Sequence, residues 1–346
     1  MTNFELSVAT DDAMKVKAGI NIISNSYLRS PIKKVLYYMI SRRNIRVKVM
    51  QLLYALETME GSKADPVKTL RQQLDASKEL FVYIIYIITE IARYAEKDAA
   101  LRASKNLPTT ADLNVNIKLA GNELIWKIIE NESYKTAVEV TKVDKIDNGD
   151  MVRKLYQELV ETPEFKTYAA LQLREKSKER EIVKFIFNNI MLPSESFISQ
   201  VEEHFNNWDD DAEMMVQLVA NYLQKPHSFD LRDMVQEEKW KFAKSLLQTT
   251  QEKRKFVGEM IKPKLKNWDA ERIALLDMIM MRMGICEFLY FETIPPKVTI
   301  NEYIDIAKQY STEQSGQFIN GVLDNIHKEL LAAGKINKID FNKQKA

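Results

Sequence analysis

The sequence has 346 residues, of which 45% are hydrophobic, enough for a sizeable buried core in two ordinary domains or one domain with a large insertion. Its 50 basic and 49 acidic residues leave a net charge of +1, so any attraction to nucleic acid has to come from a local patch. The single cysteine, Cys286, excludes an internal disulfide and a cysteine-based zinc cluster, and its apolar surroundings are typical of a core residue.

The composition of the chain indicates helices along its whole length. Only nine glycines and nine prolines interrupt it, and the segments between them are rich in Leu, Ile, Lys, Glu, Gln and Met, which are good helix formers. We therefore expect an all-α fold in which the prolines lie between helices and start or end them.

Positive charge is concentrated near residue 40, in the stretch "ISRRNIRVKVMQ". A helix over residues 42–56 places an aliphatic stripe on one side and Arg42, Arg43 and Arg46 along its edge. No acidic residue occurs from Met39 to Leu56, and positive charge in a first turn opposes the helix dipole, so stability alone does not explain the arginines. Two interpretations stay open: a solvated helix end, or a phosphate-binding segment like arginine-rich RNA-binding segments.

The longest apolar stretch is "LFVYIIYII", Leu80 to Ile88, which is about half the length that a helix needs to cross a bilayer. Glu5, Asp11 and Asp12 come early, and no apolar segment precedes a small-residue cleavage site, so the N-terminus lacks the pattern of a secretory signal. We expect a soluble cytoplasmic protein that does not contact a membrane.

The C-terminal third carries clear helix signals. Trp268 to Tyr290 is apolar on nearly every side, which predicts a central helix surrounded by others. Thr299 with Glu302, in "TINE", and Ser311 with Gln314, in "STEQ", fit capping boxes and predict helix starts. The second helix has an inward stripe of Phe318, Ile319, Val322, Leu323, Ile326 and Leu330.

The patterns that would indicate an enzyme or a metal site each lack a residue that the chemistry requires. "GQFINGVL" has the glycine spacing of a phosphate-binding loop, but Val322 and Leu323 stand where Lys and Ser or Thr are needed. None of the three histidines has Glu three residues before it, which excludes the paired motif of di-iron bundles. "EEHFNNWDDD", residues 202–211, lacks calcium-loop spacing and favours a solvated helix end. We expect no catalytic residue, no metal, no cofactor and no enzyme activity.

Five stretches resemble the NusB family of transcription antitermination factors. "RRNIRVKVMQLLYALE" resembles the family's arginine-rich first helix. Four further stretches resemble the family's remaining helices in the same order: "FAKSLLQTTQEKRKFVGEMIKPKL", "MRMGICEF", "IPPKVTINEYIDIAKQY" and "QFINGVLDNI". The resemblance covers about 39–60 and 236–330 and implies a NusB-like helical bundle.

The same resemblance divides the chain. Residues 39–60 and 236–333 form the NusB-like core, and 61–235 is a helical insertion of unknown role, far longer than the family's usual connection. Residues 334–346 are a basic C-terminal tail. Residues 1–38 are an extension that is either disordered or an artefact of start-codon choice.

The resemblance implies a factor that pairs with the ribosomal protein NusE on boxA-type single-stranded RNA of ribosomal RNA transcripts, within the RNA polymerase antitermination complex. RNA backbone contacts are implied for Arg42, Arg43, Arg46 and Lys48. Gln317 and Phe318 are implied near the bases, where an aromatic ring supplies a stacking face. Phe318 also belongs to the core stripe, and both roles stay open.

The NusE side is implied on the central helix at Asp277, since an acidic surface suits a strongly basic ribosomal protein. Gln314 stands where the family commonly has an acidic residue, so contacts there are expected to differ. For Arg282 and Glu287, which match the family's "LRxxxxE", an internal ion pair is preferred to a binding role. Tyr54 is expected in the core, and Asn301 and Glu302 as capping residues.

Three functions stay open. The leading one is the RNA-binding antitermination factor, and the second is a NusB-derived protein-interaction scaffold with weak or no RNA binding. These two differ in whether the insertion covers the arginine edge or leaves it accessible. The third, a hydrolase using carboxylates of the insertion, requires acids that converge in a pocket.

Overall fold

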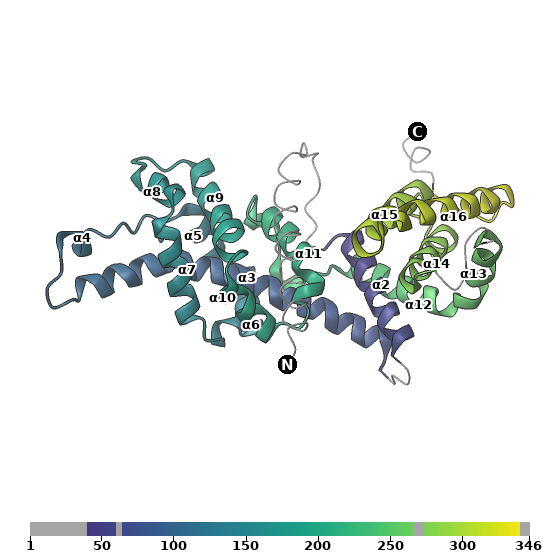
Figure 1. Ribbon diagram of the computed structural model, residues 1–346, viewed down its shortest axis with the longest axis horizontal. Coiled ribbons are helices and arrows are strands. Elements are labelled where there is room, and N and C mark those ends of the chain that lie inside the picture. The colour runs from purple at the N-terminus through teal and green to yellow at the C-terminus, as the bar shows by residue number, and fades with distance from the viewer. Residues whose placement is uncertain (1–39, 60–63, 266–272, 340–346) are drawn as a thin grey trace, which may run out of the picture. The chain divides into compact units, whose positions relative to one another are not determined.

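The structure is a computed structural model that describes residues 40–59, 64–265 and 273–339. The expected extension, 1–38, lies outside the described residues, as do the last seven residues of the expected tail. Every secondary-structure element in the described ranges is a helix, which confirms the all-α prediction (Figure 1). The chain divides into two compact units, which we call the discontinuous unit (40–74 and 235 onward) and the central unit (75–234).

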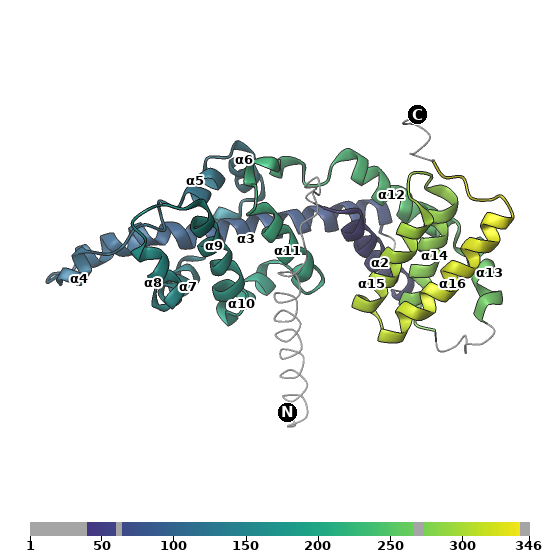
Figure 2. The same cartoon turned by 90° about the horizontal axis from the view of Figure 1, so that it is seen from above.

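The discontinuous unit is built around α14 (Leu275–Tyr290). This helix packs against α2, α12, α13, α15 and α16, and both views show it among them (Figures 1 and 2). Its side chains from Ile279 to Phe288 are buried on all sides, as the sequence predicts for a central helix. The surrounding helices are α2 (Arg42–Thr58), α12 (Glu237–Glu252), α13 (Arg254–Ile261), α15 (Pro296–Tyr310) and α16 (Glu313–Ala332).

Three helix starts differ from the sequence predictions. Helix α14 begins at Leu275 and not at Trp268, which lies outside the described residues. Helix α15 begins at Pro296, because proline suits a first helical position, so the capping box at Thr299 is wrong. Helix α16 is capped one residue later than predicted, by Thr312, whose hydroxyl accepts from the backbone N–H of Ser315 at 3.3 Å.

The central unit is organised along the long helix α3 (Pro66–Ala103), from Asp75 onward. The apolar stretch Leu80–Ile88 lies on this helix and is buried except at Tyr86. No helix in the described ranges is long and apolar enough to cross a membrane. Shorter helices lie along α3 in both views: α4 (Thr110–Leu113), α5 (Glu123–Ile129), α6 (Glu132–Thr141), α7 (Gly149–Glu161), α8 (Pro163–Ala170), α9 (Lys176–Phe185), α10 (Glu195–His204) and α11 (Trp208–Tyr222).

Buried polar contacts hold these helices to α3. The Tyr83 hydroxyl donates to Asn148 Oδ1 at 2.6 Å, and the Ser77 hydroxyl donates to Asp211 Oδ2 at 2.6 Å. Asp211 is 1% exposed, so this part of the acidic stretch 202–211 is not the solvated helix end that the sequence favours. The carboxylate instead fixes the first turn of α11 to α3.

Candidate nucleic-acid interface

Helix α2 is the element that presents the arginine run. Ser41 is its N-cap, and the Ser41 and Asn44 side chains form a reciprocal capping box. Its inner face buries Ile45, Val49 and Leu53 against α12 and α14. The helix therefore begins at the first arginine, Arg42, and the apolar stripe sets its orientation.

Arg46 lies in the interior of the discontinuous unit, where only 2% of the residue is exposed. Its Nε donates to Glu287 Oε1 at 2.7 Å and its Nη2 to Glu287 Oε2 at 2.9 Å, while Nη1 donates to Glu302 Oε2 at 3.2 Å. Burial by itself lowers the pKa of Arg46, but the charge and hydrogen bonds of Glu287 outweigh it and raise the pKa above its usual value. Three of its five N–H groups bond to these carboxylates, and because the side chain is buried in the fold, RNA cannot reach the guanidinium in this geometry.

Glu287 is the centre of this buried network. Its two oxygens also accept from the Thr299 hydroxyl and the Tyr303 hydroxyl, each at 2.9 Å. Burial and the charge of Glu287 raise the pKa of Tyr303, which keeps its hydroxyl a donor. Thr299 and Glu302 are therefore partners of a buried ion pair, and the capping role expected for Glu302 is wrong.

Arg42 and Arg43 remain at the surface of α2, with side chains 33% and 30% exposed. Arg42 Nη2 donates to Glu238 Oε1 at 2.7 Å, and its guanidinium lies 5.5 Å from the Phe242 ring centre. Arg43 Nη2 donates to Gln309 Oε1 at 3.1 Å, and its Nη1 lies 3.9 Å from Asp305 Oδ2. These two guanidiniums are fixed in place yet accessible to a ligand.

Two further basic residues of the discontinuous unit, Lys239 and Lys48, are buried. Lys239 on α12 is 8% exposed, and burial together with the nearby charges of Arg42 and Arg46 lowers the pKa of its ammonium group. Lys48, the fourth expected backbone contact, is 3% exposed. Of the four basic residues that the sequence predicts as RNA contacts on α2, only Arg42 and Arg43 are therefore accessible.

The other expected site residues lie on α14 and α16. Gln314 and Gln317 are exposed on α16, whereas Phe318 is 7% exposed and belongs to the core stripe. Asp277 is 5% exposed and accepts from the hydroxyls of Ser311 and Ser315, each at 2.7 Å. Its carboxylate therefore fastens α14 to the connection between α15 and α16 and does not face outward.

Arg282 and Glu287 do form internal ion pairs, but not with each other. Arg282 donates through Nη1 and Nη2 to the two oxygens of Glu57 on α2, at 2.8 and 2.9 Å. Glu57 also pairs with Arg254 Nη2 at 3.0 Å. Tyr54 is 44% exposed, so its expected place in the core is wrong.

Residues 196–328 match the model of the NusB family. This chain carries a NusB family domain. Transcription antitermination protein NusB of Salinibacter ruber is 43% identical over 97 residues, which are 28% of this chain and 61% of that protein. The protein of the same name from Chloroherpeton thalassium is 47% identical over 72 residues, 21% of this chain and 34% of that protein. That of Methylacidiphilum infernorum is 41% identical over 100 residues, 29% of this chain and 66% of that protein.

The chain thus spans about a third to two thirds of the length of these relatives. Their names describe antitermination proteins and not enzymes. No solved structure matches the chain significantly. The NusB match begins within the central unit at α10, contains α12 to α15 and ends within α16, and it does not include α2.

Sequence reasoning missed the acidic partners of the arginines. Glu238, Glu287, Glu302 and Asp305 come from α12, α14 and α15, between 196 and 262 positions away from the arginines that they meet. Neither charge spacing nor helix periodicity relates positions so far apart. The one available signal was the acidic residue of "LRxxxxE" within an apolar helix, because a buried carboxylate requires a partner.

Proposed function

We propose that this chain is a non-enzymatic transcription antitermination factor that binds boxA-type single-stranded RNA and pairs with NusE. In this proposal α2 is the first helix of the NusB domain, and the part of the central unit that precedes the family match, residues 75–195, is an insertion into it. The observation that carries the proposal is the position of Arg42 and Arg43: both sit on the first turn of a helix that packs into the NusB domain, and both remain about one-third exposed.

The partners of these arginines are weak enough to exchange for phosphate. Glu238 is 70% exposed, and exposed ion pairs contribute only about 0–1 kcal/mol. Asp305 lies at 3.9 Å, and Gln309 is neutral. A phosphate oxygen accepts charge-assisted hydrogen bonds from guanidinium, so RNA can replace these partners at small cost.

Arg46, Lys48 and Phe318 have a different role in this proposal. Because all three are buried, they hold α2 and α16 in place and do not contact RNA. Gln317 is exposed on α16, and its amide can read base edges. The exposed Gln314 contacts NusE in this proposal, and Asp277 positions the start of α16 by accepting from the Ser315 hydroxyl. Such a factor acts on nascent transcripts, so the proposal includes a cytoplasmic location.

Fluorescence anisotropy of a labelled boxA-type RNA, over a range of salt concentrations and with or without NusE, tests the proposal. We expect tight binding at low salt that NusE strengthens. If Arg42 and Arg43 each neutralise one phosphate, Arg42→Ala with Arg43→Ala should reduce the slope of log affinity against log salt by about 1.4, roughly 0.7 for each contact.

The matched control removes two arginines elsewhere. Arg93 and Arg153 in the central unit each pair with one carboxylate and are 59% and 49% exposed, so their double alanine variant loses the same charge and should keep the wild-type slope. Equal slopes for both double variants would remove α2 from the RNA site. No binding by the wild type at low salt with NusE present would indicate a protein-interaction scaffold instead.

A further inference from the structure

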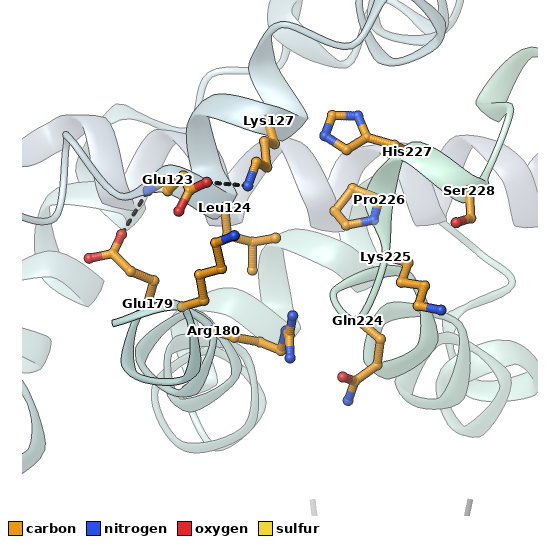
Figure 3. A pocket seen from close by; sticks show the side chains of 11 residues that line it. Glu123, Leu124, Lys127, Glu179, Arg180, Gln224, Lys225, Pro226, His227 and Ser228 are labelled. Carbon is orange, nitrogen blue, oxygen red and sulfur yellow. Dashed lines mark hydrogen bonds and ion pairs between the residues drawn. The ribbon is translucent and has the colours of Figure 1, made fainter. Parts of the chain in front are cut away.

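The central unit contains a pocket of about 250 Å³ that the NusB domain's proposed function does not use. Three segments line it: α5, α9 and residues 224–228 after α11. Figure 3 shows Arg180 extending from α9 into the space toward Gln224 and Lys225. Leu124 and Pro226, both buried, supply apolar walls.

Basic side chains outnumber acidic ones around this pocket. Its lining contains four basic residues, Lys127, Lys176, Arg180 and Lys225, and two acidic residues, Glu123 and Glu179. Both carboxylates are already engaged. Glu123 pairs with Lys127, and Glu179 accepts from the Glu123 backbone N–H at 2.7 Å (Figure 3). Glu179 also accepts from the Tyr168 hydroxyl at 2.9 Å.

Arg180 lines this pocket with its Nε buried and unbonded among the described residues. Its guanidinium makes no hydrogen bond or ion pair with any residue that the structure describes, and its Nε is buried. Burial and then the charge of Arg180 lower the pKa of the neighbouring Lys184, against the opposing charge of Glu181. A buried donor without an acceptor is costly, so a native structure that retains one calls for an acceptor.

We propose that this pocket binds a phosphate group, with Arg180 as its principal donor and Lys176 as a second cation. A guanidinium offers parallel N–H donors that match two oxygens of a phosphate, and an ammonium group adds charge without a fixed direction. The phosphate can belong to a small nucleotide or to an RNA backbone. The proposal does not depend on the function proposed for α2.

Isothermal titration calorimetry of the full chain at low salt tests it with three probes. These are inorganic phosphate, adenosine 5′-monophosphate and a short single-stranded RNA without a terminal phosphate. The RNA arm uses the Arg42→Ala, Arg43→Ala background, so that the α2 surface does not contribute. Binding of the monophosphate but not the RNA identifies a small nucleotide, and binding of the RNA identifies its backbone.

Two variants and one control decide the outcome. We expect Arg180→Gln to weaken binding about tenfold or more, because it removes charge-assisted hydrogen bonds. The exposed Lys176→Gln should weaken it about threefold and cannot disturb the core. Arg153→Gln, on α7, should leave binding unchanged, and circular dichroism checks that each variant is folded. Absence of binding for all three probes, or equal affinities for wild type, Arg180→Gln and Lys176→Gln, would overturn the proposal.

Discussion

Three neighbouring arginines of one motif differ in burial and in the partners that they contact. Arg42 and Arg43 stay at the surface, whereas Arg46 is buried against Glu287. Residue 46 lies one turn further along α2 than residue 42, and there its side chain reaches Glu287 on α14 and Glu302 on α15. At the residue scale, charge type was visible in the sequence, but its burial and its partner were not.

The buried pair gives a stability prediction. Glu287→Gln leaves the Arg46 guanidinium buried without its main counter-charge, so we expect a loss of about 3 kcal/mol in the free energy of unfolding. Urea titrations followed by circular dichroism measure this loss in the transition of the discontinuous unit, which contains both residues. Glu238→Gln is the control, because it removes the exposed partner of Arg42 and should change the free energy of unfolding by less than about 1 kcal/mol. Equal losses in the free energy of unfolding for Glu287→Gln and Glu238→Gln would contradict the conclusion that Glu287 is the main counter-charge of Arg46.

At the element scale, the sequence was most informative where a helix is buried on every side. Helix α14 has apolar residues around its whole circumference and is the centre of its unit. The starts of α15 and α16 were displaced because capping motifs are short and recur by chance, and proline at the first helical position overrode the motif at Thr299. Helix existence was therefore predictable, and its first residue was not.

The burial of α14 predicts an inert thiol. Burial raises the pKa of Cys286 to about 12, so the folded protein keeps the unreactive thiol form at pH 8. A chromogenic thiol reagent should modify Cys286 far more slowly in the native protein than in urea. The native rate should also stay low between pH 7 and 9, whereas the unfolded chain titrates near its usual pKa of about 8.5. A native rate that rises with a midpoint near pH 8.5 would show that the thiol is accessible.

At the scale of the whole molecule, the chain forms two units with separate cores. Residues 40–74 and 235 onward form one, although 160 residues of the central unit separate them in sequence. The NusB match begins within the central unit, at residue 196, so family similarity and compactness divide the chain at different positions. The compact units are defined by contacts between residues, because each unit has to bury its own apolar surface.

Separate cores predict two unfolding transitions in scanning calorimetry. Phe288→Ala, in the core of the discontinuous unit, and Phe187→Ala, in the core of the central unit, each remove a fully buried ring and should cost about 3–5 kcal/mol. We expect each substitution to lower the midpoint of a different transition. A single transition that both variants shift equally would show that the units unfold together.

The sequence by itself determined the helical class, the central helix, the inward stripe of α16 and the resemblance to the NusB family, because these depend on local composition and on periodicity within one helix. Only the tertiary structure decided that Arg46 and Asp277 are buried, that Glu287 holds α2, and that the Arg180 guanidinium lines a pocket without a partner among the described residues. These properties depend on side chains that are brought together from distant positions, and helix periodicity carries no information about which distant residues will meet.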